Sequence, residues 1–313
     1  MSLFFNILIL IALFVILGVS ADIAVNNIRS IAKALHLKLF ALGIVLGLFT
    51  TLPEFSVGIN ASLEGSGSIS VGNIMGGVIV LIGLILGTSL ILNKKIGTGD
   101  SLKTLFPACL VILSPFLLGI DGSYGFLDGL VMISLYVGLI FYLYYLNRDK
   151  NLDGQLAIID KGKIGKSVVF AILGVILVML ASHWIVQITL GLLETIKISE
   201  LFIGLILFAI GTNLPEITIT ITAWRKKSSE LSLSHLLSSA FTNIFVLGSL
   251  SVLSPINFET NIVYYVLVFF AVLIVTLLFI FAKSDRSLSR REGGILLLIY
   301  IIFVVINIFL AKG

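Results

Sequence analysis

Charged residues are scarce in this sequence. Asp, Glu, Lys and Arg make up 12% of its 313 residues, whereas a soluble globular protein has about 25%. Charged side chains are almost never buried without a partner, so a soluble protein of this length would show many more of them at its surface. The hydrophobic share is 58% and the mean hydropathy is +1.19. The composition excludes a soluble enzyme and indicates that lipid surrounds most of the chain.

Side chains for redox and zinc chemistry are equally scarce. The chain has one cysteine, Cys109, and three histidines, which gives no internal disulfide and no CxxC or His/Cys cluster for a structural metal. Basic residues occur singly or in short runs between apolar stretches, so the net charge of +4 does not indicate a nucleic-acid partner. We expect no cofactor, no nucleic acid and no obligate protein partner, and the oligomeric state stays open.

Ten apolar stretches are long enough to cross a bilayer as helices, which takes about 20 residues each. They lie at residues 3–21, 38–63, 71–92, 104–119, 125–146, 166–188, 198–224, 232–253, 261–282 and 294–311. A charged linker at residues 147–165 divides them into two sets of five, in residues 1–146 and 166–313. The sequence therefore predicts an all-α polytopic membrane protein of ten helices in two halves.

Basic residues indicate the orientation. The loops after the first, third, fifth, seventh and ninth stretches hold 18 of the 20 Lys and Arg residues, and positively charged loops stay in the cytoplasm. Both termini are therefore expected outside and the linker 147–165 inside. A signal peptide at residues 1–20 is the alternative, but no basic residue precedes Arg29, as a signal peptide would require. We expect the first stretch to remain in the mature protein.

A short motif occurs twice. Residues 50–54 read TTLPE and residues 212–216 read TNLPE, at an offset of 162 that also aligns residues 72–77 with 234–239. Because each half has an odd number of spans, the second half enters the membrane from the opposite side. The sequence thus predicts two inverted five-helix repeats, an architecture in which transporters bind their substrate near the bilayer midplane.

Two acidic residues, Glu54 and Glu216, are expected far from both membrane surfaces. Glu54 lies ten residues before Glu64, and Glu216 lies nine before Arg225. Each is therefore roughly 15 Å from a surface, about half of the hydrocarbon core. The other 14 acidic residues are expected in loops or near span ends. An ionised group at mid-membrane costs at least about 2.5 kcal/mol, and no basic residue lies at that depth. A bound cation or proton is expected to supply the counter-charge.

Oxygen-bearing residues surround these carboxylates. Pro53 and Pro215 each remove a mid-helix hydrogen bond and free carbonyls about one turn upstream, so the second and seventh spans are expected to be broken. Side-chain oxygens come from Thr50, Thr51, Thr212 and Asn213. Such an all-oxygen set suits a hard cation such as Ca²⁺. Small residues on the following helices are expected to allow close packing: Gly72, Gly76, Gly77, Ser234, Ser238 and Ser239.

The stretches GLFTTLPEFSVGINA and AIGTNLPEITITITA, each followed by a helix rich in glycine or serine, resemble the two alpha-repeats of the cation/Ca²⁺ exchanger superfamily. This resemblance is concentrated in residues 43–87 and 205–248, and the superfamily includes Na⁺/Ca²⁺ and H⁺/Ca²⁺ antiporters. It implies that Glu54 and Glu216 are the central ion-binding carboxylates. It also implies further site residues, Thr50, Thr51, Asn73, Thr212, Asn213, Ser239 and Asn243, and a movement of the first and sixth spans against the rest.

Several positions depart from the superfamily pattern. Leu81 stands where an Asn or Asp is common, while the second half has Asn243. Phe49 replaces a usual glycine, Gly77 a usual serine, and His235 a usual asparagine. The first half has thus lost side-chain oxygens, which is expected to weaken or remove a Na⁺ site. His235 is interpreted as an interfacial polar residue or a pH-sensing group.

The sequence therefore predicts a secondary antiporter of a prokaryotic plasma membrane, with Ca²⁺ and either Na⁺ or H⁺ as transported substrates and the lipid bilayer as its surroundings. A cation/proton exchanger of other selectivity is the nearest alternative, and a passive cation channel is another. A third reading takes the two glutamates as protonated structural groups. An intramembrane enzyme is disfavoured because HExxH and GxSxG motifs are absent.

Overall fold

The computed structural model describes residues 3–34, 47–93, 95–97, 102–147, 164–196, 198–225, 229–285 and 287–311. Nearly all of these residues are helical. Eight helices within them are long and apolar enough to cross a membrane: Phe4–Ile31, Gly67–Asn93, Lys103–Asp121, Phe126–Leu146, Ile164–Leu193, His235–Leu253, Ile262–Lys283 and Arg290–Leu310. A shorter apolar helix covers Glu200–Thr212. The chain is a polytopic all-α membrane protein.

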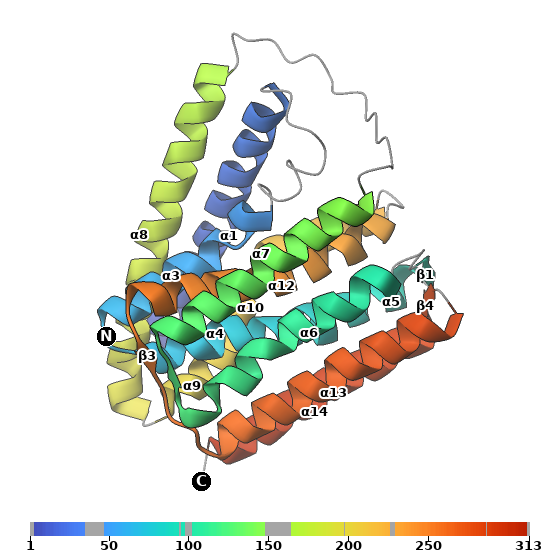
Figure 1. Cartoon of the computed structure of the whole chain (residues 1–313). Coiled ribbons are helices and arrows are strands. Elements are labelled where there is room, and N and C mark those ends of the chain that lie inside the picture. The colour runs from blue at the N-terminus through green and yellow to red at the C-terminus, as the bar shows by residue number, and fades with distance from the viewer. Residues whose placement is uncertain are drawn as a thin grey trace.

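The elements follow one another along the chain (Figure 1). Those before the linker are α1 (Leu3–Ala34), α3 (Leu52–Leu63), α4 (Gly67–Ile79), η1 (Val80–Leu86), α5 (Gly87–Asn93), β1 (Lys95–Gly97), α6 (Leu102–Leu118), η2 (Gly119–Asp121), β2 (Ser123–Tyr124) and α7 (Phe126–Asn147). Those after it are α8 (Ile164–Ile196), α9 (Glu200–Ile203), η4 (Gly204–Phe208), α10 (Ala209–Thr212), α11 (Leu214–Arg225), α12 (Ser229–Leu253), β3 (Ile256–Asn257), α13 (Ile262–Asp285), β4 (Ser287–Ser289) and α14 (Arg290–Leu310).

Eight of the ten predicted spans correspond to these long helices. The third is helical throughout, but its middle segment, η1, has π-helical hydrogen bonding. The stretch 198–224 is not one long helix, because α10 ends and α11 begins on either side of Asn213. The first part of 38–63 lies outside the described residues, which resume at position 47. A count of ten spans therefore stays a prediction.

The predicted bounds of the first and sixth spans were too short. The stretch 3–21 belongs to α1, which continues to Ala34, and 166–188 belongs to α8, which continues to Ile196. Hydropathy falls after position 21, but the helix does not end there, because polar side chains bond to their own helix. The Asn27 side chain donates to the Ile23 carbonyl at 2.8 Å. Asp22, expected near a span end, therefore lies within α1, inside the candidate span Phe4–Ile31.

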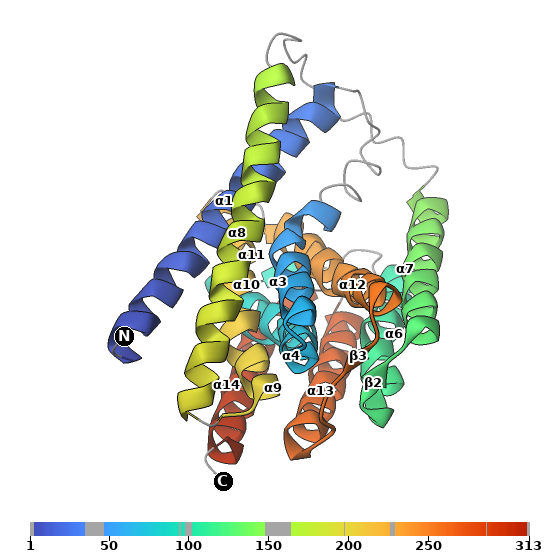
Figure 2. The same cartoon turned by 90° about the vertical axis from the view of Figure 1, so that its left-hand side faces the viewer.

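Helices α1 and α8 run side by side along one flank of the molecule (Figures 1 and 2). They approach closely at Gly174, where an added Cβ would lie 2.9 Å from the Ser20 carbonyl oxygen. Their buried apolar side chains, with those of α3 and η4, form a cluster of their own that includes Phe14, Leu17 and Val178. A second, larger cluster lies between α4, η1, α6, α12, α13 and α14. The α1/α8 pair thus packs on α3, α4 and η4 through an apolar cluster that is distinct from the larger one.

Two short strand pairs join the ends of helices. β1 pairs antiparallel with β4, and β2 pairs antiparallel with β3. The segments after the predicted third and ninth spans therefore lie side by side at one end of the bundle, and those after the fourth and eighth lie side by side at the opposite end (Figure 1). Ser289 begins α14 with a capping box, in which its hydroxyl accepts from the Glu292 N–H and the Glu292 carboxylate accepts from the Ser289 N–H.

Candidate cation-binding site

The two copies of the Leu-Pro-Glu motif adopt the same local structure. Thr51 interrupts the first helix with φ −90° and ψ 13°, and Asn213 interrupts the second with φ −86° and ψ 13°. The carbonyl of each accepts a hydrogen bond from the N–H four residues later, at 3.0 Å from Phe55 and 3.1 Å from Ile217. A proline in the first turn has no N–H to leave unsatisfied there. The predicted helix breaks are therefore present, one in each half.

Glu54 and Glu216 lie in the first turns of α3 and α11. Both side chains are 1% exposed. They are close enough for their charges to act on one another, and Glu54 also interacts with Thr212, and Glu216 with Ser239. One oxygen of each carboxyl, Oε2, has no hydrogen-bond partner among the described residues. The structure thus brings together two buried acids, each with an oxygen available to a ligand.

Thr212 connects the second motif to the first half of the chain. Its hydroxyl lies 3.0 Å from Asn73 Oδ1 on α4 and 3.0 Å from the Phe208 carbonyl oxygen. Both Thr212 and Asn73 are fully buried, and the Asn73 amide nitrogen has no partner in the described part of the chain. These two predicted site residues therefore meet beside Glu54.

Two asparagine side chains meet at Gly77. A Cβ added to Gly77 would lie 3.1 Å from Asn243 Nδ2 and 3.3 Å from Asn213 Nδ2. Asn213 donates to the Ala209 carbonyl at 2.8 Å, whereas neither polar atom of the Asn243 amide is paired within the described segments. The absence of a side chain at Gly77 makes room for both amides, and Asn243 has an unused oxygen and an unused nitrogen.

The carbonyls upstream of the prolines are already hydrogen-bonded. The Thr50 hydroxyl donates to the Gly47 carbonyl and the Thr51 hydroxyl to the Leu48 carbonyl, both at 3.0 Å. In the second motif, the Asn213 side-chain amide donates to the Ala209 carbonyl at 2.8 Å. A buried carbonyl without a partner is costly, and these nearby donors satisfy it. Each carbonyl keeps a second lone pair, and the Thr50 and Thr51 hydroxyls keep their own lone pairs as acceptors.

Small residues allow α4 to pack directly against the backbone of α9 and η4, the segments that precede the second motif. A Cβ on Gly72 would lie 2.6 Å from the Leu201 carbonyl oxygen, and one on Gly76 would lie 2.9 Å from Leu205 Cα. In the other half, a Cβ on Gly47 would lie 3.1 Å from Ser238 Oγ of α12. The close packing predicted for these positions is confirmed, except at Ser234, whose side chain lies outside the described residues.

Sequence reasoning missed two residues near the site. Thr242 is fully buried, and its hydroxyl lies near Gly47 and interacts with Tyr136. Its position four residues after Ser238 was the available signal, because such residues share a helix face. Asp22 acts electrostatically on Glu216, and the signal for it was the lack of any helix breaker after position 21.

The structure places two of the residues that depart from the superfamily pattern, Leu81 and His235. Leu81 is fully buried in the larger apolar cluster, so no side-chain oxygen reaches the site from there. His235 lies near the start of α12, where Arg29 of α1 acts on it electrostatically, and its Nε2 has no partner among the described residues.

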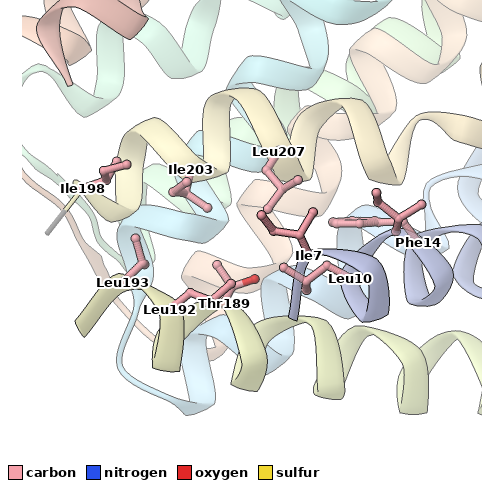
Figure 3. A pocket seen from close by; sticks show the side chains of 10 residues that line it. Ile7, Leu10, Phe14, Thr189, Leu192, Leu193, Ile198, Ile203 and Leu207 are labelled. Atoms are coloured by element: carbon pink, nitrogen blue, oxygen red, sulfur yellow. The ribbon is translucent and has the colours of Figure 1, made fainter. Parts of the chain in front are cut away.

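A pocket of about 180 Å³ lies elsewhere, between α1, α8 and the α9–η4 segment (Figure 3). Its lining is apolar apart from Thr189 and includes Leu10, Phe14 and Leu207. None of the predicted site residues lines it, and its lining contains no charged side chain. Beside the pocket, Phe14 of α1 packs edge-on against Phe208 of η4, with ring centroids 5.8 Å apart.

No group of three or more His, Cys, Asp or Glu side chains that could hold a metal ion occurs within the described ranges. Any cation at this site would therefore be bound by two carboxylates and neutral oxygens. Glu54, Glu216, Asn73, Thr212, Ser239 and Asn243 provide such oxygens. Carboxylate, hydroxyl and amide oxygens are the ligands that hard cations prefer.

The chain matches the sodium/calcium exchanger protein family over residues 5–145 and 166–309. It is 25% identical over 344 residues to the sodium/calcium exchanger MaX1 of Methanosarcina acetivorans, with 96% of this chain and 98% of the relative covered. A structure of the sodium-calcium exchanger NCX_Mj soaked with 2.5 mM Na⁺ and 1 mM Sr²⁺ is 26% identical, covers 97% of this chain and 99% of its own, and gives a TM-score of 0.67. The H⁺/Ca²⁺ exchanger CAX shares the fold, with a TM-score of 0.75, 17% identity, and 97% and 86% covered.

Proposed function

The chain belongs to the sodium/calcium exchanger protein family, and from that premise we propose that it is a secondary active antiporter that exchanges Ca²⁺ for Na⁺ or H⁺ by alternating access. It is an integral membrane protein with multiple spans. Family members are exchangers rather than catalysts, so its substrates are the transported ions.

The observation that carries this proposal is the pair of buried carboxylates. Glu54 and Glu216 are each 1% exposed and act on one another electrostatically. Each has an oxygen without a partner in the described part of the chain. Two negative charges in a low-dielectric interior are stable only when a cation or protons neutralise them. One Ca²⁺ or two protons would balance the pair.

Competition for this pair supplies the coupling. When both carboxyls are ionised, they bind Ca²⁺ together with neutral oxygens from Thr212, Asn73, Ser239 and Asn243. The counter-ion releases Ca²⁺ by neutralising the same charges. Because the site without any cation carries two unbalanced charges, reorientation of the empty site is unfavourable. Exchange rather than leak follows from that cost.

Inverted repeats of five helices each would bring the two motifs together at mid-membrane. The equal backbone angles at Thr51 and Asn213 support this symmetry, and so does the matching hydrogen bond that follows each break. Under this proposal α3 is the second half of the second span, and α9 to α11 form the seventh. The ten spans would then consist of the eight long helices and these two broken ones.

The strand pairs support the proposed topology. β1 and β4 follow the third and ninth spans, and β2 and β3 follow the fourth and eighth, so each pair joins loops that the alternation of spans puts on one side. Both termini lie in the lower half of the views (Figures 1 and 2). With the basic loops inside, the termini are outside, and the linker 147–165 is cytoplasmic. A prokaryotic plasma membrane suits the chain's compact form.

The α1/α8 pair is the proposed moving part. Its apolar cluster, shared with α3, α4 and η4, is distinct from the larger one, and the apolar pocket in Figure 3 lies between part of the pair and the α9–η4 segment. Hydrogen bonds connect α8 to α3. The Ser182 hydroxyl oxygen of α8 lies 2.7 Å from that of Ser56 and accepts from the Asn60 side chain at 2.9 Å. Such a pair can shift against the larger apolar cluster while that cluster stays packed.

A specific observation favours H⁺ as the counter-ion. Leu81 and Gly77 bring no side-chain oxygen to the first half, where the second half has Asn243 and Ser239. A proton needs only the carboxylates, whereas Na⁺ needs additional oxygens around it. A cation/proton exchanger is therefore the second candidate function.

The test is uptake of ⁴⁵Ca²⁺ into proteoliposomes under an outward Na⁺ gradient and, separately, an outward H⁺ gradient. Uptake driven by either gradient supports antiport, and the more effective gradient identifies the counter-ion. Uptake that is equal without any gradient, together with unitary currents in electrical recordings, would indicate a passive channel. No uptake under either gradient contradicts the proposed function.

A further inference from the structure

Asp22 is an acidic residue within a membrane-spanning helix. It lies in α1 between Phe4 and Ile31, the bounds of a candidate span, and its side chain is partly buried. No hydrogen bond or ion pair of Asp22 is present among the described residues. A carboxylate at such a position, without a basic partner, is costly and marks an ion pathway more often than it serves packing.

Contacts of α1 place Asp22 close to the second motif. A Cβ added to Gly18 would lie 3.4 Å from Leu214 Cβ and 3.9 Å from Pro215 Cδ. Asp22 follows Gly18 by four residues, so it lies on the same face of α1, about 6 Å further along the axis. It is near enough to Glu216 for its charge to act on that carboxyl.

The direction of α1 shows on which side of the site Asp22 lies. Further along α1, Arg29 acts electrostatically on His235, which lies near the start of α12, and α12 follows the end of α11. Helices α1 and α11 therefore run in the same direction, from Leu214 toward Arg225. Asp22 lies one turn from the central carboxylates toward this basic end, which the proposed topology places in the cytoplasm.

We propose that Asp22 is a transient cation-binding residue on the path between the central site and the cytoplasmic face. This inference rests on the proposed function. A Ca²⁺ ion that leaves Glu216 toward the cytoplasm meets a second carboxylate before it reaches water, and an ion that enters from that side is attracted there first. Carboxylate and water oxygens are both ligands of Ca²⁺, so one carboxylate can hold the ion briefly while it is still partly hydrated. Because α1 belongs to the proposed moving pair, movement would also change the distance between Asp22 and Glu216.

Because Asp22 lies on one side of the central site, its proposed role in cation binding predicts an effect on transport from one face only. A structural role does not predict this. A residue that only stabilises α1 would affect transport from both faces alike. A cation-binding residue on the cytoplasmic path lowers the concentration of Ca²⁺ needed for half-maximal exchange from that face only. The equilibrium affinity of the central site, measured in detergent, depends far less on it.

The experiment compares Asp22→Asn with the wild type in proteoliposomes of fixed orientation, with ⁴⁵Ca²⁺ applied to one face at a time. Asp22→Asn is expected to raise the half-maximal Ca²⁺ concentration on the cytoplasmic face roughly five- to tenfold, because a charge that attracts the cation in a medium of intermediate dielectric is lost. The outer face should change by less than about twofold. Asp22→Glu should restore the cytoplasmic value. Asn27→Ala, which removes a polar side chain from the same helix without a change of charge, is the matched control.

The outcomes separate this inference from the function on which it rests. If the wild type exchanges Ca²⁺ and Asp22→Asn changes both faces equally or neither, the role of Asp22 is overturned and the antiport proposal stands. If Asp22→Asn does not give a monodisperse protein, Asp22→Glu decides: wild-type values on both faces support the inference, and a change on both faces overturns it. If the wild type shows no Ca²⁺ exchange, both proposals are overturned.

Discussion

The two halves of the candidate site have the same backbone but different side chains. The helix breaks at Thr51 and Asn213 have nearly identical angles. Both the Thr50 and the Thr212 hydroxyl lie 3.0 Å from a carbonyl oxygen of their own helix, but only Thr212 also lies 3.0 Å from a side chain of the other half, Asn73. The facing helices differ in the same sense, because the first half has Gly77 and Leu81 where the second has Ser239 and Asn243.

This difference shows that two features of the site are set by different residues. Proline sets the helix break, and the residues of the facing helix set the number of oxygens. A proline with its neighbouring residues is sufficient to break a helix and to place a glutamate in the first turn of the next one. The number of oxygens around that glutamate depends on the residues of the facing helix. The two halves can therefore bind one cation symmetrically through carboxylates while the neutral ligands come mainly from the second half.

The largest expected effect comes from the features that the two halves share. Glu54→Gln and Glu216→Gln should each lower Ca²⁺ exchange at least about 100-fold, because each removes a full charge from a buried site where a charge interaction is worth several kcal/mol. Both proteins should remain monodisperse in gel filtration. Glu200→Gln, at the start of α9, is the matched control and should retain exchange. Retention of more than a tenth of the wild-type rate in either variant would contradict equal roles.

A smaller effect is expected when the first half receives the oxygen that it lacks. Leu81→Asn should increase Na⁺-driven Ca²⁺ exchange by about threefold to tenfold and lower the stability by about 1–3 kcal/mol, since it places a polar group in an apolar cluster. Flux under a Na⁺ gradient and thermal unfolding measure the two effects. Leu81→Met keeps the volume without an oxygen and should change neither greatly. No gain in Leu81→Asn would show that position 81 does not limit Na⁺ coupling.

The hydrogen bond between Thr212 and Asn73, which joins the two halves, predicts that substitutions of Thr212 and Thr50 differ in their effect on Ca²⁺ affinity. Thr212→Val should raise the Ca²⁺ concentration for half-maximal exchange about fivefold, because it removes a buried hydrogen bond worth about 1 kcal/mol. Thr50→Val should change it less, since the Thr50 hydroxyl bonds within its own helix. Both are measured as ⁴⁵Ca²⁺ concentration curves. A larger effect at Thr50 would reverse the assigned asymmetry.

The smallest effect is expected at Gly77. In Gly77→Ser the new Cβ would lie 3.1 Å from Asn243 Nδ2, and this flexible amide can shift by a few tenths of an ångström. We expect a change of about twofold or less in Ca²⁺ affinity, because the carboxylates are untouched. Gly77→Leu, which fills the space of both amides, should reduce the affinity much more. Equal effects of the two substitutions would show that space at position 77 is unimportant.

Local features were predictable from the sequence. The repeated Leu-Pro-Glu motif predicted both helix breaks because proline acts on its own turn, whatever surrounds it. The close approach at Gly72 and Gly76 followed from residue size alone. Burial of Glu54 and Glu216 followed from their distance along the helix to the nearest charged residues.

Features that depend on packing or on helix length were not predictable in the same way. The contact between Thr212 and Asn73 joins residues that are 139 positions apart. The aliphatic residues of η1, VLIGLIL, are as compatible with an α-helix as with the π-helical hydrogen bonding observed. Hydropathy placed the end of the first span before Asp22, but helical hydrogen bonding continues through this residue to Ala34. The place of Asp22 inside a membrane-spanning helix was therefore not predicted from the sequence.

The central claim is that Glu54 and Glu216 form one cation site. Equilibrium dialysis with ⁴⁵Ca²⁺ on the purified wild type and the two glutamine variants tests it most directly. The account predicts one Ca²⁺ bound per wild-type chain and the loss of this same site in each variant. Binding of one Ca²⁺ with wild-type affinity to either variant would contradict it.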